Sequence, residues 1–365
     1  MRIFRIDDNS PYSQAVGIGG LGTGMFFSLE GNHTLGRNES RAARLLDAKD
    51  YCKLHIVMHY IAKLLGAGPA GIFSVLPIGA VGDDAAGDSV RQELASVGVD
   101  TRFVEKIAGL PTLFSACFQY PDGSGGNITT NNSAASALRC LHPAVENVLA
   151  SAGTRGIALI LPEVPLEARR RFLEVASRQG ALRIASFVSA EIASAEKMGM
   201  FDELDLIAVN EDEASGLIGT SFSPERPEFF LDQCARFLRN GHPSLRMVIS
   251  AGKQGAYALS QDSWNCCQAP GVRIASTTGA GDCLLGGIVA ALAAGVPLLN
   301  SKPPRKSLLE RSLDTALEFG VLLASYKVTS PHTIHPQASV SSLLQFAEEV
   351  GTQFAPTIQQ LLVEA

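Results

Sequence analysis

Short apolar runs alternate with longer helical patterns over the second half of the chain. The strand-length apolar runs cover residues 157–161, 184–188, 206–209, 247–250 and 256–259. Between them, residues 166–179 and 190–198 repeat apolar positions at helical spacing. This alternation predicts an α/β fold, in which a mostly parallel sheet is covered by helices on both faces. Ligands of such sheets bind outside the carboxyl ends of the strands, so we expect the chemistry there.

The first half of the chain has a less regular pattern. Strand-like runs cover residues 15–22, 25–29 and 71–79, and helix-like runs cover residues 54–65 and 84–97. A glycine-rich turn at 121–126 lies between two strand-like stretches and predicts a β-hairpin. The polar stretch 30–53 fits either a mobile flap or a solvated face, and its composition does not separate the two.

The most informative stretch runs from Ser276 to Asp282 and continues into an apolar helical run over 283–292. Gly279 and Gly281 let the backbone approach a ligand closely, and the free amides at a helix start attract an anion such as a phosphate. A carboxylate beside such a site makes sense as a base that takes the proton from the attacking group. The alternative is a plain helix start, where an acid in the first turn is favourable.

Two other strand ends carry polar residues. Asn210 and Glu213 follow the strand 206–209 and fit a helix capping box, or a site where they order the waters of Mg²⁺. The strand 247–250 runs into Ser250-Ala251-Gly252-Lys253-Gln254-Gly255. This second end either flanks a triphosphate or makes an ordinary tight turn.

Composition and charge exclude several classes of protein. With 46% hydrophobic and 18% charged residues over 365 positions, the chain is a folded protein with ample core. Its net charge of −6 argues against a general binder of nucleic acid or anionic membranes. Its seven cysteines show no C-x-x-C spacing, which indicates reduced thiols and a cytoplasmic protein. The charge-free stretch 283–301 is interrupted by glycines and Pro297, which favours a buried helix over a membrane span.

His55 and His59 lie four residues apart on the helix predicted over 54–65. That spacing can bind zinc, as in a zinc hydrolase, but the glutamate of H-E-x-x-H is missing and no clear third ligand follows. Ordinary packed or surface histidines are therefore the favoured interpretation.

Taken together, the three strand-end segments resemble the PfkB (ribokinase-like) family of carbohydrate kinases. The stretch 277–282 with Gly286-Gly287 is similar to the family's C-terminal signature, Asn210-x-x-Glu213 to its magnesium and phosphate motif, and 250–255 to its nucleotide-binding turn. The stretches 79–87 and 98–100 match its usual first-half pattern. The resemblance spans about residues 70 to 330 in the family's order.

This resemblance implies one three-layer α/β/α domain over 1–365, with a small β-sheet lid from about 23–40 and 101–130. It implies transfer of the γ-phosphate of ATP to a hydroxyl of a sugar-like molecule, with Mg²⁺ and possible involvement of a monovalent cation. Asp282 is then the base, and the amides of Gly279, Ala280 and Gly281 form the anion hole. The expected nucleotide-side residues are Asn210, Glu213, Ser250, Gly252, Lys253, Gly255 and Thr278, with Asn210 and Glu213 holding Mg²⁺ through water. A carboxylate turned away from the site, or bonded to a fixed cation, would remove the enzymatic interpretation.

The acceptor half departs from the family's pattern. The family's Gly-Gly-x-x-x-Asn segment corresponds to about residues 50–55 here, which have neither the glycine pair nor the asparagine. The candidate substrate contacts are Asp47, Asp50, Lys53, Asn131 and Asn132. A nucleoside is the alternative acceptor, and a catalytically idle relative that binds a sugar or a protein partner is the alternative function.

Residues 331–365 carry apolar side chains at helical spacing, which predicts a helical tail packed on the domain or in a contact between copies. The spaced residues are Leu343, Leu344, Phe346, Val350 and Phe354. Lid-to-lid dimers are common in the family that the chain resembles, so a homodimer is an additional expectation.

Overall fold

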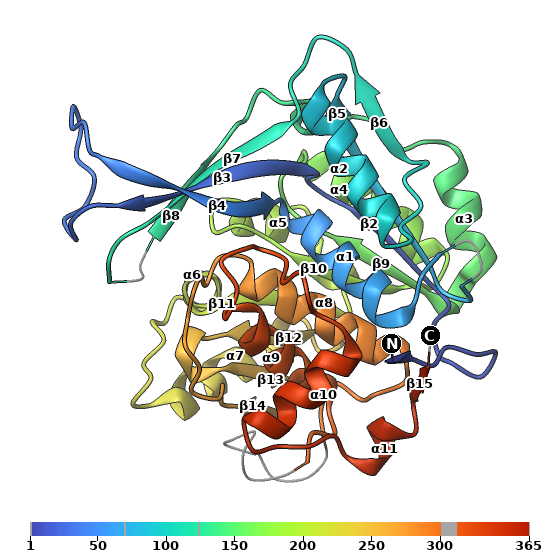
Figure 1. The fold of residues 1–365 in the computed structure, drawn as a ribbon. Helices are drawn as coiled ribbons and strands as arrows, with labels where there is room; N and C mark the ends of the chain where they lie inside the picture. The colour runs from blue at the N-terminus through green and yellow to red at the C-terminus, as the bar shows by residue number, and fades with distance from the viewer. Residues whose placement is uncertain (1, 69–70, 123–124, 301–311, 365) are drawn as a thin grey trace.

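The structure is a computed structural model that describes residues 2–68, 71–122, 125–300 and 312–364. Within these ranges the chain forms a nine-stranded main sheet in the order β14-β13-β12-β11-β10-β9-β2-β5-β6 (Figure 1). In this order, every neighbouring pair of strands from β12 to β6 is parallel. At the other edge, β13 pairs antiparallel with both β12 and β14. The mostly parallel sheet expected from the alternating pattern is therefore confirmed.

The main-sheet strands are β2 (Gln14–Ile18), β5 (Ser74–Gly82), β6 (Val104–Ile107), β9 (Gly156–Ile160), β10 (Leu182–Ser186), β11 (Leu206–Asn210), β12 (Arg246–Ser250), β13 (Ala256–Leu259) and β14 (Trp264–Cys267). The helices are α1 (Lys53–Leu65), α2 (Ala85–Ser96), α3 (Ala144–Ala152), α4 (Leu166–Arg178), α5 (Ile192–Lys197), α6 (Glu211–Ile218), α7 (Pro227–Gly241), α8 (Ala280–Ala293), α9 (Ala316–Lys327), α10 (Val340–Glu349) and α11 (Pro356–Gln359). Short 3₁₀ turns occupy Ala134–Ala137, Gly153–Arg155, Phe201–Glu203 and Gly252–Gln254.

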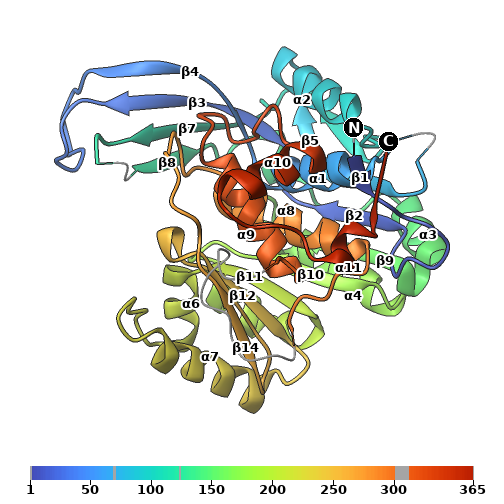
Figure 2. The same ribbon diagram turned by 60° about the horizontal axis from the view of Figure 1, so that its bottom comes forward.

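Two hydrophobic cores lie on the two faces of the main sheet. One face packs against α1, α2, α8 and α9, with buried side chains such as Leu54 and Ile288. The other face packs against α3 to α7, with buried side chains such as Phe172 and Leu231. Figure 2 shows the helices on both sides of the sheet. The central strands, such as β2 and β9, are buried on both faces, which explains why they appear in the sequence as continuous apolar runs.

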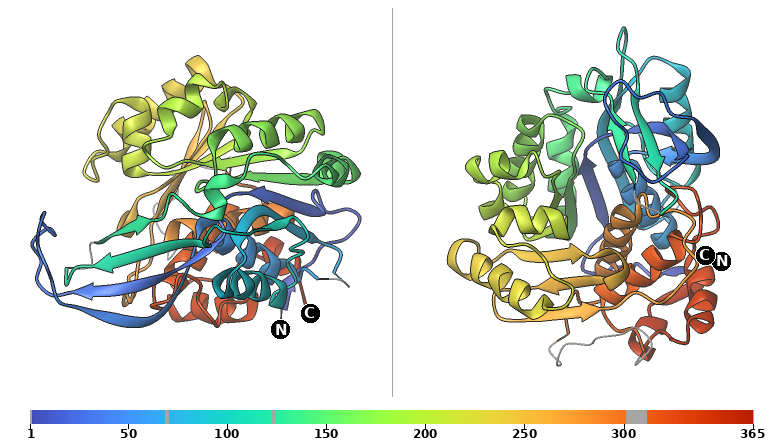
Figure 3. Two further views of the ribbon diagram at one scale, coloured as in Figure 1. Left: turned by 90° about the horizontal axis from the view of Figure 1, so that it is seen from above. Right: turned by 90° about the vertical axis from the view of Figure 1, so that its left-hand side faces the viewer.

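A separate four-stranded sheet projects from one edge of the molecule, in the order β4-β3-β7-β8 (Figure 3). It consists of β3 (Gly22–Leu29), β4 (Ala43–Tyr51), β7 (Leu113–Gln119) and β8 (Gly125–Thr129). We call it the lid sheet. It differs from the sequence expectation of 23–40 and 101–130, because residues 104–107 pair with β5 in the main sheet. The edge strand comes instead from 43–51, whose polar side chains left the sequence pattern undecided, and β7 pairs with β8 in the expected hairpin.

The C-terminal segment is helical in part. Helix α10 starts with a capping box at Ser339 and buries Leu343 and Phe346, as the spacing predicted. The chain then departs from a purely helical tail, because β15 (Leu362–Glu364) pairs antiparallel with β1 (Arg2–Phe4) and brings the two ends of the chain together (Figure 1). Among the described residues, no helix is both long and apolar enough to cross a bilayer.

Candidate active site

Asp282 lies in the first turn of α8, behind a tight turn over residues 277–280. The Ala280 N–H donates to the Thr277 carbonyl at 3.1 Å, and Gly279 has φ 76° and ψ 3°. These values are those of the third residue of a type II β-turn, which needs a positive φ. A Cβ at Gly279 would also lie 3.2 Å from both the Cβ and the carbonyl oxygen of Thr333. The sequence therefore needs glycine here for its backbone conformation and for space.

The amides at this turn are only partly available to a ligand. The Ala280 N–H is held in the turn, but among the described residues those of Gly279 and Gly281 donate to no protein acceptor. Both glycines line a cavity of about 240 Å³ together with Asp282 and Thr277. Free N–H groups at a helix start, next to a cavity, are suited to binding an anion. Two of the three amides predicted for the anion hole are thus free, and the third has a role in holding the turn.

Lys53 is the nearest cation to Asp282 among the described ion pairs. Its Nζ lies 3.7 Å from Asp282 Oδ1, beyond hydrogen-bond distance, and both side chains line the 240 Å³ cavity. The charges of Asp282 and then Glu163 raise the pKa of Lys53 against the opposing effect of burial. The carboxylate faces the cavity and is not tied up in a hydrogen bond with the lysine.

Glu163 is a site residue that the sequence pattern did not single out. It follows β9 at the carboxyl edge of the sheet, has φ 74°, and accepts a hydrogen bond from the Lys53 backbone N–H at 3.1 Å. A positive φ at a non-glycine residue costs about 1–3 kcal/mol and is often found at functional sites. Burial raises its pKa to about 7, and Lys53 partly opposes that shift. The sequence feature that could have identified Glu163 is its position directly after the strand-like apolar run 157–161.

A cavity of about 720 Å³ opens beside Glu163, between the lid sheet and the main sheet. Its polar lining residues are Lys53, Asn127, Thr129, Thr130, Asn131, Ser133, Ser136, Glu163, Glu191 and Glu213. The carboxylate of Glu191 is fixed by fully buried Arg169, whose Nη2 lies 2.6 Å from Glu191 Oε1. Ser133 Oγ is buried and has no hydrogen-bond partner within the described chain. This cavity offers hydroxyl, amide and carboxylate groups to a ligand.

A third cavity, of about 470 Å³, lies on the other side of the turn. It is lined by Ser250, Gly252, Lys253 and Gly255, which follow or end β12 and were predicted as nucleotide contacts, and by Gly281 from α8. The remaining lining is mostly aliphatic and comes from residues 269–274 and from α9. Thr278 lies apart from this cavity and lines a smaller one, of about 190 Å³, with residues of the lid sheet.

Asn210 and Glu213 form the capping box that their spacing predicted. The Glu213 N–H donates to Asn210 Oδ1 at 2.8 Å, and the Asn210 N–H donates to Glu213 Oε2 at 2.9 Å. Both side chains also line the 240 Å³ cavity, and Glu213 reaches the 720 Å³ cavity as well. Burial raises the pKa of Glu213, while the Asn210 N–H and Lys53 oppose this. Asn210 and Glu213 therefore cap helix α6 and also line a cavity.

The predicted substrate contacts fall into two groups. Lys53 and Asn131 line the 720 Å³ cavity. Asp47 is exposed on β4 and Asn132 is exposed after β8, and neither lines any of the cavities described above. All of these were candidate substrate contacts in the half of the chain that departs from the family's pattern, but Asp47 is exposed on β4, which pairs with β3 at the edge of the lid sheet. The geometry therefore does not support Asp47 and Asn132 as substrate contacts.

Asp50 is buried at the base of the lid sheet, with 3% of its surface exposed. The Cys117 thiol donates to its Oδ2 at 3.3 Å, and burial raises its pKa to about 6 in spite of that bond. A Cβ on Gly24 of the facing strand would come within 2.2 Å of the same oxygen. Asp50 therefore links β4 to β7 through the Cys117 thiol and packs closely against Gly24 of β3, at the point where the lid meets α1.

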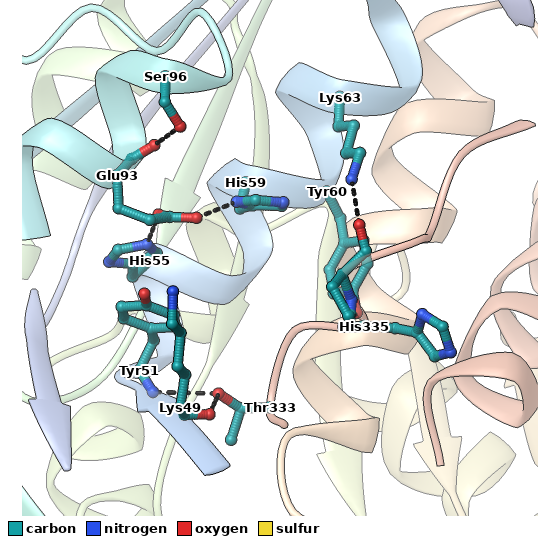
Figure 4. A network of polar contacts seen from close by, with 11 residues as sticks. Lys49, Tyr51, His55, His59, Tyr60, Lys63, Glu93, Ser96, Thr333 and His335 are labelled. Atoms are coloured by element: carbon teal, nitrogen blue, oxygen red, sulfur yellow. Dashed lines mark hydrogen bonds and ion pairs between the residues drawn. The ribbon is translucent and has the colours of Figure 1, made fainter. Parts of the chain in front are cut away.

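The third ligand that the two histidines lacked in the sequence is Glu93 on α2. His59 Nδ1 lies 2.8 Å from Glu93 Oε1, and His55 Nε2 contacts Glu93 Oε2 (Figure 4). Burial lowers the pKa of His55. Burial also disfavours the ionised form of Glu93, but the contacts with both imidazoles outweigh it and keep the pKa of that carboxyl well below its usual range. The ligand atoms are close enough to hold a metal ion, but the Glu93 carboxylate already contacts both imidazoles and links α1 to α2, while His55 Nδ1 stays buried without a hydrogen-bond partner among the described residues.

The pfkB family carbohydrate kinase model matches residues 57–339 of the chain. The chain belongs to the PfkB family of carbohydrate kinases. It is therefore a phosphotransferase with an alcohol group as acceptor. Among curated relatives, the ribokinase of Haemophilus influenzae is 24% identical over 271 residues, which cover 74% of this chain and 80% of the relative.

Solved structures show the same fold in other PfkB-type kinases. A ribokinase from Cryptococcus neoformans in complex with ADP aligns with a TM-score of 0.73 at 18% identity, covering 91% of this chain and 99% of its own. An Escherichia coli protein described as a ribokinase II, in complex with ATP and Mg²⁺, aligns with a TM-score of 0.68 at 18% identity, covering 92% and 99%. The ribokinase-like three-layer fold expected from the sequence is confirmed.

Proposed function

We propose that this PfkB kinase transfers the γ-phosphate of ATP to a hydroxyl of an uncharged sugar or sugar-like molecule. One observation carries the proposal: the three larger cavities lie next to one another in a row, and Asp282 lines the middle one. The 470 Å³ and 240 Å³ cavities share Ser250 and Gly281, and the 240 Å³ and 720 Å³ cavities share Lys53 and Glu213. Phosphoryl transfer needs this arrangement, because the transferred group must lie between the donor nucleotide and the acceptor.

Each cavity suits one part of the reaction. The aliphatic 470 Å³ cavity accommodates the nucleoside end of ATP, with Lys53 and Lys253 lying on the phosphate path. The Gly279 and Gly281 amides receive the γ-phosphoryl oxygens, and their positive dipoles are fixed before the reaction starts. Asp282 takes the proton from the attacking hydroxyl, which makes that oxygen a better nucleophile.

Asn210 and Glu213 fit a magnesium site. Mg²⁺ prefers oxygen ligands and keeps several waters, and the Glu213 carboxylate reaches a polar cavity where the phosphates would pass. We expect these two residues to hold the ion through water. Bound there, Mg²⁺ would neutralise charge on the phosphate oxygens. A bound Mg²⁺ with ATP is present in the similar Escherichia coli structure.

The acceptor cavity favours neutral polyols over phosphorylated sugars. Three carboxyl groups line it, those of Glu163, Glu191 and Glu213, together with one lysine, Lys53. Glu191 is paired with Arg169 and Lys53 with Asp282, which leaves Glu163 and Glu213 without an ion-pair partner among the described residues. A sugar phosphate would bring two further negative charges next to these carboxylates, whereas hydroxyl groups can donate to them. No aromatic side chain is among the described residues lining the cavity, so a nucleoside base would find no stacking partner.

If the protein were a catalytically idle relative, we would expect the groups that bind and transfer the phosphoryl group to be missing or blocked. Here the free amides, Asp282 and Lys53 meet at one cavity, which supports turnover rather than binding alone.

A coupled assay of Mg·ATP consumption with a panel of neutral sugars, sugar phosphates and nucleosides tests the proposal. Phosphorylation of a neutral sugar, with the phosphate located on a hydroxyl by NMR, is the expected result. Turnover restricted to nucleosides or sugar phosphates would contradict the proposed acceptor class. Binding of sugars without any turnover would instead favour the idle relative.

A further inference from the structure

A fully buried lysine lies behind the anion-site turn. Lys327 is the last residue of α9 and has 0% of its surface exposed. A buried ammonium is costly unless its N–H groups find acceptors, so its partners indicate what it is for. No local pattern in the sequence marks this residue.

Both acceptors of Lys327 belong to the segment that forms the turn. Its Nζ donates to the Ser276 carbonyl at 3.1 Å and also to the Thr278 carbonyl. The backbone reinforces the contact, because the Ala275 N–H donates to the Val328 carbonyl at 2.7 Å. The end of α9 is thus joined to the turn by side chain and main chain together.

The bond to Thr278 fixes the orientation of one particular peptide. Type I and type II turns differ by rotation of the peptide between their second and third residues, which here joins Thr278 to Gly279. In a trans peptide the carbonyl and the N–H point in opposite directions. With the Thr278 carbonyl held by Lys327, the free Gly279 N–H points away from the lysine. Gly279 lines the 240 Å³ cavity and Lys327 does not, so the ammonium lies behind the turn.

The charged groups around Lys327 come from three elements. Burial is the largest influence on its charge and lowers the pKa of Lys327 to about 8. Asp50 on β4 and Asp282 on α8 act in the other direction and favour the ammonium form, while the neighbouring Cys283 thiol stays protonated because burial raises its pKa to about 12. His335, in the segment before α10, has its own pKa lowered by burial and in part by Lys327.

We infer that Lys327 is a positioning residue for phosphoryl transfer: its ammonium holds the Thr278–Gly279 peptide so that the Gly279 N–H faces the γ-phosphoryl group. It also places a built-in cation on the carbonyls of Ser276 and Thr278, which are oxygen ligands of the kind that bind metal cations. The enzyme then needs no monovalent cation at this turn. This inference rests on the proposed function and concerns how the anion site is built.

The test compares Lys327→Ala with Lys327→Met, which keeps the volume, and with Lys63→Met as a control. Lys63 also donates to a carbonyl, that of Pro336 at 3.1 Å, but has no bond to the turn (Figure 4). We expect both Lys327 variants to lose about 100-fold in kcat, the scale for losing an oriented donor, with the sugar KM changed less than threefold. Ammonium or potassium ions at 100 mM should restore about tenfold to Lys327→Ala, in comparison with tetramethylammonium at equal ionic strength. Wild type and Lys63→Met should respond less than twofold.

Nucleotide binding gives a readout that does not depend on the acceptor. The rise in Tm caused by a non-hydrolysable ATP analogue should shrink in Lys327→Ala and recover with ammonium, while the rise caused by ADP should persist. Unchanged kcat in both folded variants would overturn the inference, as would equal loss of ADP and ATP-analogue stabilisation. A wild-type requirement for potassium would overturn its second part. If wild type phosphorylates no sugar, the proposed function fails while the Tm comparison still decides the role of Lys327.

Discussion

Lys53 Nζ lies 3.7 Å from Asp282 Oδ1, and the two residues come from helices that start about 230 positions apart in the chain. Both face the same 240 Å³ cavity, at its junction with the acceptor cavity. The lysine attracts the carboxylate without occupying it through a hydrogen bond, so the carboxylate can still accept a proton. In the proposed reaction the same lysine would then meet the phosphoryl group as it passes.

Asp282→Asn should fold normally and lose at least about 100-fold in kcat, because the amide keeps the shape of the carboxylate but cannot take the proton. Steady-state kinetics with the identified sugar measures the loss, and circular dichroism with Tm checks the fold. Asp262→Asn, at an exposed loop position, serves as the control. Near-normal turnover of Asp282→Asn would remove the assignment of Asp282 as base.

Lys53→Met should reduce kcat by about 10- to 100-fold, since one cation on the path of the phosphoryl group is lost. Residues that act as a unit are not additive, so the double variant with Asp282→Asn should be little worse than Asp282→Asn alone. A double-mutant cycle on kcat provides the measurement. Losses that multiply fully would show that the two residues act independently.

Glu163→Gln should raise the KM for the acceptor sugar about tenfold or more and leave the KM for ATP nearly unchanged. Glu163 lines the 720 Å³ cavity but neither the 240 Å³ nor the 470 Å³ cavity, so its effect should be confined to the acceptor. Glu167→Gln, at an exposed position in the first turn of the neighbouring helix α4, is the control. Equal changes in both KM values would show a general structural effect instead.

The kcat of wild type should fall as pH rises through about 8, because that is the pKa of buried Lys327 and its ammonium is present below this value and lost above it. The fall should be absent in Lys327→Met measured over the same range. Glu163, with a pKa of about 7, titrates in both proteins and is therefore cancelled in the ratio of the two profiles. A ratio independent of pH between 6.5 and 9.5 would contradict this prediction (the range brackets both pKa values).

Glu93→Gln should destabilise the fold by about 1–3 kcal/mol at pH 7, since the bridge to His55 and His59 loses its charge and one good acceptor. The folded-state pKa of Glu93 lies below its ordinary 4.5, so this stabilisation is present above about pH 4.5 and is lost as pH falls below it. Urea unfolding of both proteins at pH 7 and at pH 4 measures the difference, with exposed Glu105→Gln as control.

The same cluster allows a direct test of the zinc alternative. If the bridge is complete without a metal, purified protein should contain no stoichiometric zinc, and a chelator should leave its Tm unchanged. Stoichiometric zinc that is lost in His59→Ala would instead establish a metal centre between α1 and α2.

The sequence by itself determined the layered α/β architecture and the local geometry of the proposed phosphate side, that is, the turn before Asp282 and the capping box of Asn210 and Glu213. Buried strands and amphipathic helices have periods that local sequence displays, and the turn before Asp282 needs glycine for its own backbone. Asn210 and Glu213 likewise interact across three residues, so their capping box could be predicted from spacing. All of these features depend on residues that are close in the chain.

Only the tertiary structure decided the lining of the proposed acceptor cavity and the surroundings of Asp282. Glu163, Lys327 and Glu93 reach partners that lie 110, 49 and 38 positions away, so no local pattern marks them. Asp47 was predicted to contact the substrate but lies at the surface, because the face of a strand that is exposed to solvent depends on its pairing with a distant strand. Local sequence fixes the conformation of a turn or a helix end, whereas the charges that surround a carboxylate depend on how remote segments pack around it.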